Sequence, residues 1–107
     1  METSNPILMK LRAALDEMYG TRIERVVLYG SRARGDARSD SDYDVAVFLK
    51  DIRDAAERWA EADKIAETAT ALLMETGAVI HAMPYRAAQY NERSPLMHEI
   101  RREGLAL

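Results

Sequence analysis

The stretch VVLYGSRARGDARSDSDYDVAVFL, residues 26–49, has an apolar run at each end and a polar loop between them. Both runs are rich in β-favouring residues and are bounded by Gly, Ser and Asp, which predicts two strands. Side chains alternate between the two faces of a strand, so Asp42 and Asp44 are expected to point to the same face. The stretch therefore predicts a pair of neighbouring carboxylates where the second strand begins.

The paired carboxylates indicate a metal site. Two such groups a few ångströms apart repel each other unless a cation lies between them. Mg²⁺ suits this arrangement, because it usually binds one or two carboxylates and completes its coordination with water and phosphate oxygens. We therefore predict Asp42 and Asp44 as Mg²⁺ ligands in a site that also binds nucleotide phosphates.

The Gly30-Ser31 pair, directly after the first predicted strand, is the candidate phosphate-binding turn. Glycine lets the backbone approach a phosphate closely, and residues 31–35 could form a short helix whose free N–H groups face the anion. Arg32 and Arg34 could add charge-assisted hydrogen bonds to phosphate, or could equally well pair with the nearby acids. A simpler interpretation of residues 36–44 is an acidic surface turn, since Asp and Ser are frequent turn residues.

Length and composition restrict the class of protein. With 107 residues, the chain is expected to form a single domain, residues 1–107. The net charge of −3 argues against general nucleic-acid binding, which favours a basic surface. The chain has no cysteine and no apolar run of membrane-spanning length, so we expect no disulfide and no membrane segment. The cytoplasm is the expected location.

The order of predicted elements is helix, strand, short helix, strand, long helix, strand and short helix. Strands separated by helices favour an α/β fold with helices packed on a sheet. The first predicted helix begins at the Ser4-Asn5-Pro6 cap and ends at Gly20, the long helix begins near Asp51 and runs to 76 before Gly77, and the last helix covers 96–103 before Gly104. The strands are predicted at 23–29, 45–49 and 78–83, and Pro84 is expected to end the third strand.

Two side chains on these elements have more than one interpretation. Trp59 belongs to a predicted apolar stripe of the long helix, and we expect it to lie in the core rather than to bind a partner. The same stripe includes Leu73. His81 is a lone histidine in a strand, where a structural role is more common than a functional one.

The complete motif, Gly30-Ser31 followed after ten residues by Asp42-x-Asp44, resembles that of the minimal nucleotidyltransferases (MNT) of the DNA polymerase β-like superfamily. The final residues SPLMHEIRREGLAL, 94–107, also resemble the short closing helix of these proteins, so the resemblance covers nearly the whole chain. It implies an α/β fold with a small mixed sheet flanked by helices.

The resemblance also implies roles for the motif. It makes Asp42 and Asp44 catalytic residues that hold Mg²⁺, and Gly30 and Ser31 the ligands of the β- and γ-phosphates. The implied reaction is attack of an acceptor hydroxyl on the α-phosphorus of ATP, with transfer of AMP and loss of pyrophosphate. One departure is visible, because the strand that should carry a third carboxylate reads GAVIHAMP, residues 77–84. His81 lies about where that acid would be and could act as a general base, or catalysis could be weak or lost.

Three functional hypotheses follow from the resemblance. The first is an antitoxin that transfers AMP to a tyrosine of a HEPN-type toxin, which suits a chain too short to enclose a small acceptor in an extra domain. The second is an antitoxin that neutralises its partner by binding alone. The third is a small-molecule nucleotidyltransferase of the aminoglycoside-modifying type, completed by dimerisation. Homo-oligomers and hetero-oligomers both stay open.

Overall fold

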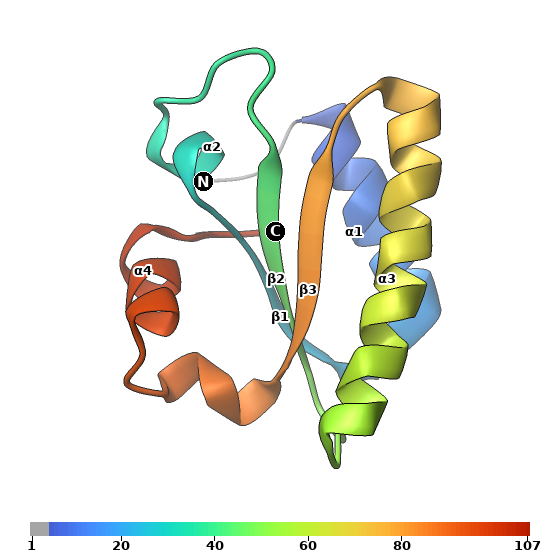
Figure 1. The fold of residues 1–107 in the computed structure, drawn as a ribbon, viewed down its shortest axis with the longest axis vertical. Coiled ribbons are helices and arrows are strands. Elements are labelled where there is room, and N and C mark those ends of the chain that lie inside the picture. Colours follow the sequence, from blue (N-terminus) through green and yellow to red (C-terminus); the bar gives the residue numbers. More distant parts are fainter. Residues whose placement is uncertain (1–4) are drawn as a thin grey trace.

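In the computed structural model, four strands form one mixed sheet in the order β3-β2-β1-β4. Figure 1 labels the three longer strands of this sheet, β1, β2 and β3. The structure describes residues 5–107, so Ser4 of the predicted cap lies outside the described residues. The seven expected elements occur in the expected order, and the structure adds two 3-10 helices and a fourth, two-residue strand at the end. The elements are α1 (Pro6–Tyr19), η1 (Gly20–Arg22), β1 (Ile23–Tyr29), α2 (Ser31–Arg34), β2 (Tyr43–Leu49), α3 (Ala55–Thr76), β3 (Ile80–Arg86), η2 (Ala87–Asn91), α4 (Pro95–Glu103) and β4 (Leu105–Ala106).

The strands pair in two directions. β1 is antiparallel to both β2 and β4, whereas β2 and β3 are parallel and are joined by the long helix α3. A parallel pair needs such a crossover connection, because the chain must return to the end of the sheet at which the first strand began. This confirms the expected α/β fold with a small mixed sheet flanked by helices.

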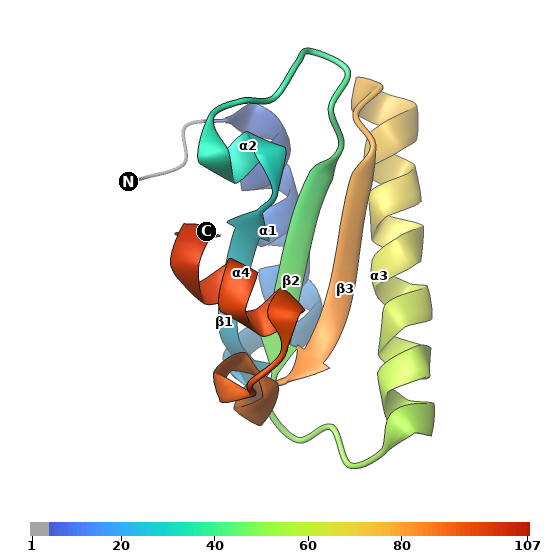
Figure 2. The ribbon, with the colours of Figure 1, turned by 60° about the vertical axis from the view of Figure 1, so that its left-hand side comes forward.

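The helices lie on both faces of the sheet. α1 and α3 cover one face, and α4 lies with η2 on the other (Figure 2). The Asn5 side chain caps α1 by accepting hydrogen bonds from the N–H groups of Ile7 and Leu8. Asp54 caps α3 in the same way, by accepting from the N–H of Glu57 at 2.9 Å. Each cap satisfies donors that a helix leaves unpaired in its first turn. Among residues 5–107, no helix is both long enough and apolar enough to cross a membrane.

The prediction that Trp59 lies in the core is wrong. Trp59 is 59% exposed and Leu73 is 39% exposed, so these two members of the predicted stripe do not face the sheet, whereas Ala69 of the same stripe is partly buried against the core. The buried residues of α3 are Glu61, Ile65 and Leu72. Glu61 can face the interior because it accepts a 2.8 Å hydrogen bond from the hydroxyl of Tyr19. The buried face of α3 is thus the one that carries Ile65 and Leu72, and the hydrogen bond to Tyr19 lets Glu61 lie on it.

The prediction that Pro84 ends the third strand is also wrong, since β3 continues to Arg86. β3 is an edge strand, where a residue without an N–H group is tolerated. The carbonyl of Pro84 accepts a 2.8 Å hydrogen bond from Nε of Arg58, and the N–H of Arg86 donates to the side chain of Gln89 at 2.8 Å. Side-chain partners therefore replace a further strand along this part of the edge.

Candidate active site

The site lies on the face of the sheet that carries α4, in a row of side chains across three strands. Tyr29 of β1 is paired in register with Asp44 of β2, and Asp44 is paired with His81 of β3. The two preceding rows on this face pack under α4 and η2 as a small apolar core, in which Val27, Ala46, Phe48, Tyr85, Met97 and Ile100 are buried. The face changes from apolar to polar at the Tyr29–Asp44–His81 row.

Asp42 joins this row from the residue directly before β2. Its Oδ2 atom lies 3.5 Å from Nε2 of His81, and both side chains are partly accessible to solvent. The structure therefore brings Asp42, Asp44 and His81 together, as the sequence predicts. His81 occupies the strand position beside Asp44, where the resemblance leads one to expect a third acid.

The environment of Asp44 disfavours its ionised form. Partial burial raises the pKa of Asp44 above its usual value, and the negative charge of Asp42 adds to the rise. His81 and Arg34 act in the opposite direction, since a positive charge on either one stabilises the carboxylate. A bound cation would therefore stabilise the ionised form of Asp44, which its burial and the neighbouring Asp42 disfavour.

The same carboxylate touches the predicted phosphate-binding turn. Gly30 has φ of +78°, and a β-carbon built on it would lie 2.5 Å from Oδ2 of Asp44. Only glycine fits here, because any side chain would collide with the carboxylate and would also be strained at this φ. Asp44 therefore occupies the space beside the turn that begins α2, which places the predicted phosphate ligands Gly30 and Ser31 next to a predicted metal ligand.

The two predicted phosphate-binding arginines have other partners in this structure. Arg34 contacts the carboxylates of Asp36 and Glu103, each at 3.3 Å, and these bonds raise its pKa. Arg32 donates to the backbone carbonyls of Ser39 and Ser41. The alternative of pairing with nearby acids thus applies to Arg34, whereas Arg32 binds the loop itself. Contact of either side chain with phosphate stays a prediction.

Tyr29 is a site residue that the sequence analysis missed. Burial raises its pKa to about 12, with smaller contributions from Tyr85, Asp44 and Glu99. The available signal was its position as the last residue of the first strand, directly before Gly30, which places it across from Asp44 once the strands pair. The shift extends to higher pH the range in which this hydroxyl group is protonated.

The carboxylate pair fits Mg²⁺ in its donor chemistry. Among residues 5–107, no group of three or more His, Cys, Asp or Glu side chains is arranged so that it could hold a metal ion. Mg²⁺ does not require such a group, because water and phosphate oxygens commonly complete its coordination around one or two carboxylates. The placement of Asp44 against Gly30 puts the predicted phosphate turn where such oxygens would be supplied.

Comparisons with known proteins agree with this geometry. A family model described as "Polymerase beta, Nucleotidyltransferase" matches residues 10–107. A Methanocaldococcus jannaschii protein named as a protein adenylyltransferase is 31% identical over 80 residues, which cover 75% of this chain and 71% of the relative.

Solved structures share the fold. A crystal structure of a toxin–antitoxin with AMP-PNP matches with a TM-score of 0.59 and 20% identity, covering 90% of this chain and 68% of that one. A complex of a tri-AMPylated Shewanella oneidensis HEPN toxin with its MNT antitoxin matches with a TM-score of 0.52 and 16% identity, covering 94% and 70% of the two chains. The solved structures thus share the fold, and the family model and the 31% identical relative confirm the resemblance to nucleotidyltransferases: the chain belongs to the polymerase beta nucleotidyltransferase family.

Proposed function

We propose that this protein transfers AMP from ATP to a hydroxyl group of a partner protein, with Mg²⁺ as cofactor. The observation that carries the proposal is the contact between Asp44 and Gly30, which joins the predicted metal ligand to the predicted phosphate turn. The relative named as a protein adenylyltransferase supports the same class of reaction.

Each residue of the site has a defined task in this reaction. Gly30 and Ser31 would hold the β- and γ-phosphates, and Asp42 and Asp44 would hold Mg²⁺. Bound Mg²⁺ would neutralise phosphate charge and make the acceptor hydroxyl easier to deprotonate. The acceptor oxygen forms a bond to the α-phosphorus, the bond from that phosphorus to the bridging oxygen breaks, and pyrophosphate leaves. The hydroxyl proton needs a base, and His81, 3.5 Å from Asp42, is the candidate.

We further propose that the acceptor is a tyrosine of a HEPN-type toxin and that the chain acts as its antitoxin. Two observations on structural neighbours support this choice. One neighbour is a toxin–antitoxin with AMP-PNP, and another is an antitoxin bound to a HEPN toxin that carries AMP groups. The open face of the row at Asp44 also suits an acceptor that brings its own surface.

The test is an AMP-transfer assay with the purified protein, Mg²⁺, α-labelled ATP and the protein encoded next to it. We expect label on a tyrosine of that neighbour, located by mass spectrometry. Asp42→Asn and Asp44→Asn should each lower the rate by about a hundredfold or more, because each removes a charged metal ligand. Asp40→Asn is the matched control, since Asp40 is an exposed aspartate of the same loop. Equal labelling by wild type and Asp44→Asn would refute the proposal.

A second candidate function is neutralisation by binding alone. The observation that favours it is His81, which stands on β3 beside Asp44 in place of a carboxylate. If Asp44→Asn still protects cells from the neighbouring toxin and the wild type transfers no AMP, binding is the function. Turnover of an aminoglycoside without any protein labelling would instead favour the small-molecule hypothesis.

A further inference from the structure

We propose that Arg32 is a positioning residue for Asp42, which it places by holding the loop of residues 36–42 against α2. The proposal assigns Arg32 to the loop rather than to the nucleotide phosphates. Its consequence for catalysis rests on the proposed function, whereas its consequence for the loop does not.

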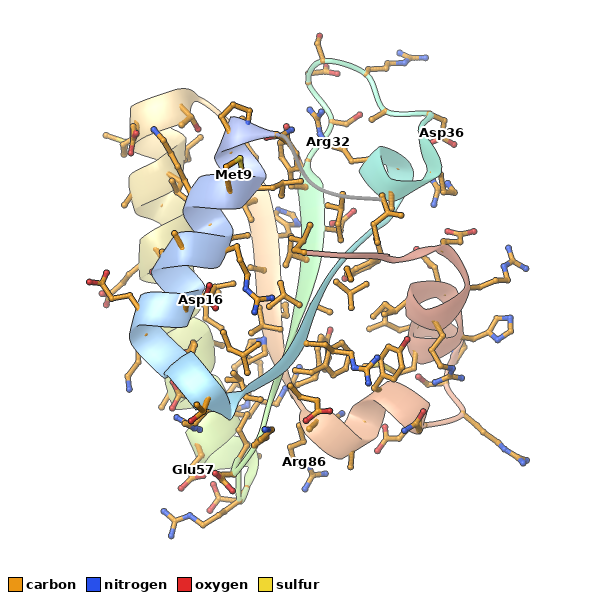
Figure 3. The ribbon with its side chains drawn as sticks, turned by 180° about the vertical axis from the view of Figure 1, so that it is seen from behind. Met9, Asp16, Arg32, Asp36, Glu57 and Arg86 are labelled. Carbon is orange, nitrogen blue, oxygen red and sulfur yellow. The ribbon has the colours of Figure 1, made fainter. Side chains whose placement is uncertain are left out.

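The contacts of the guanidinium group carry the proposal. Nε and Nη2 of Arg32 both donate to the carbonyl of Ser41, at 3.0 and 2.8 Å, and Nη2 also donates to the carbonyl of Ser39 at 3.2 Å. Figure 3 shows Arg32 between α2 and the loop that leads into β2. Ser41 directly precedes Asp42, so these bonds fix the backbone next to the residue whose side chain is the proposed metal ligand.

The residue on the other side of Asp42 is held by the same side chain. The guanidinium carbon of Arg32 lies 4.0 Å from the ring centroid of Tyr43, within the range of a cation–π contact. Tyr43 is itself anchored, because its N–H donates to the carbonyl of Val79 at 2.9 Å and its hydroxyl accepts from Asn5 at 3.0 Å. Arg32 therefore contacts the residues on both sides of Asp42, and one of them is fixed to the rest of the fold.

The rest of the loop has few other constraints. Ser41 and Arg38 close a turn through bonds from the Ser41 N–H to the Arg38 carbonyl and from the Arg38 N–H to the Ser41 hydroxyl. Residues 38–40 are exposed to solvent. Those turn bonds lie within the loop, so they shape it without attaching it to the fold. The two ends of the loop have attachments of their own, since the N–H of Asp36 donates to the carbonyl of Ser31 at 3.2 Å and Oδ2 of Asp42 lies 3.5 Å from Nε2 of His81. Arg32 makes the attachment between these ends, and because it belongs to α2 it connects this part of the loop with the turn at Gly30.

The chemistry of this attachment favours arginine over lysine. A planar guanidinium presents several N–H donors in a fixed arrangement and can stack on an aromatic ring, whereas an ammonium group is a compact point charge. Arg32 uses both properties, with one edge on two carbonyls and its plane beside Tyr43. Arg32→Lys should therefore retain the positive charge and lose most of the positioning.

Limited proteolysis tests the loop directly. Trypsin cleaves after arginine, and Arg38 lies in the exposed part of the loop. We expect Arg32→Gln to increase cleavage after Arg38 by about tenfold or more, because the rate follows local opening once the attachment is lost. Arg32→Lys should cleave nearly as fast. Arg38→Gln should remove the product and so confirm its assignment, and urea unfolding of each variant should exclude global destabilisation. Unchanged cleavage of Arg32→Gln would overturn the proposal.

Ligand binding separates positioning from phosphate contact. Mn²⁺, followed by electron paramagnetic resonance, reports on the carboxylates, and AMP-PNP in excess EDTA reports on phosphate binding without metal. We expect Arg32→Gln and Arg32→Lys to raise the Kd for Mn²⁺ by about tenfold, with little change in metal-free binding of AMP-PNP. Arg38→Gln should match the wild type in both measurements. Loss of metal-free AMP-PNP binding in Arg32→Gln with unchanged Mn²⁺ affinity would show a phosphate ligand and overturn the proposal.

The outcomes also distinguish this proposal from the proposed function. If the wild type transfers no AMP to any acceptor, the proposed function fails, yet cleavage after Arg38 still decides whether Arg32 holds the loop. If the wild type transfers AMP and Arg32→Gln shows wild-type cleavage and Mn²⁺ affinity, the function stands and the positioning role fails.

Discussion

The carboxylate of Asp44 lies against the α-carbon of Gly30, so closely that a β-carbon there would be 2.5 Å from Oδ2. This contact predicts that Gly30→Ala displaces Asp44 and abolishes AMP transfer while the fold persists. Gly35→Ala is the control, because Gly35 also has positive φ but no atom lies within 4 Å of an added β-carbon. Each variant should cost about 1–3 kcal/mol in unfolding free energy from backbone strain. Equal activity of the two variants would contradict the role of the contact.

A carboxylate at position 81 should strengthen the metal site. Residue 81 is paired with Asp44, so His81→Asp places a third acid in the row. We expect the Kd for Mn²⁺ to fall by about tenfold and AMP transfer to rise, because carboxylate is the better ligand for hard cations and can take the hydroxyl proton in place of His81. The matched control is His98→Asp on the exposed surface of α4, which should change neither quantity. Weaker Mn²⁺ binding by His81→Asp would instead assign the imidazole an essential role.

The buried bond between Tyr19 and Glu61 should contribute measurably to stability. Tyr19→Phe removes the donor and leaves a carboxylate that is 8% exposed without its closest partner. We expect the unfolding free energy to fall by about 1–3 kcal/mol, measured by urea denaturation. The carboxylate keeps Arg22 at 3.6 Å and Lys64 at 3.7 Å in this variant, so the loss should lie at the lower end of the range. The double variant Tyr19→Phe/Glu61→Leu removes the buried charge as well and should recover part of the loss. A further loss in the double variant would show that the ion pairs of Glu61 stabilise the fold by more than its burial costs.

Ionisation of Tyr29 should destabilise the protein at alkaline pH. Burial raises the pKa of Tyr29 to about 12, above the value of about 10 expected for an unfolded tyrosine. The stabilising contribution is complete below pH 10 and is lost as the pH rises to about 12, because the unfolded chain releases this proton first. Between pH 10 and pH 12, the unfolding free energy of the wild type should therefore fall by about 1–2 kcal/mol more than that of Tyr29→Phe. Parallel curves would exclude the effect.

The exposure of Trp59 predicts a simple spectroscopic result. Trp59 is the single tryptophan of the chain, and it is 59% exposed. Its fluorescence in the native state should be quenched by acrylamide nearly as strongly as in urea. Trp59→Ala should change the unfolding free energy by less than about 0.5 kcal/mol, as expected for a surface position. Weak quenching of the native protein would show that Trp59 is covered.

Several helix ends and the pair of acids at the site could be predicted from the sequence, because they depend on residues that are close together in the chain. Asn5 and Gly77 mark helix ends by local chemistry, and the alternation around Asp42 and Asp44 places two acids together whatever the rest of the chain does. These features depend on residues that are neighbours in sequence, which is why the motif could be recognised without a structure. The position of His81 near the two acids was an expectation from the family resemblance, and the pairing of β2 with β3 places it beside Asp44.

Other features depend on contacts between distant residues. The face that α3 buries carries Ile65 and Leu72, but it also carries Glu61, whose partner Tyr19 is 42 positions away, so the apolar pattern alone did not single out this face. The strand β4 has only two residues and exists because it pairs with Val27 and Leu28. The partners of Arg32 are backbone carbonyls, which carry no sequence signal. Long-range pairing therefore decided the parts that the sequence did not predict.

The proline on the edge of the sheet has a consequence for self-association. An exposed edge strand offers unpaired N–H and C=O groups to other chains and is a common starting point for aggregation. Along the second half of β3, Pro84 has no N–H to offer, its carbonyl is occupied by Arg58, and the N–H of Arg86 is occupied by Gln89. An incoming strand could pair only with the first half of this edge, near His81. The second half of this edge is thus guarded against sheet growth, whereas the half beside the candidate active site keeps groups that could pair with another strand.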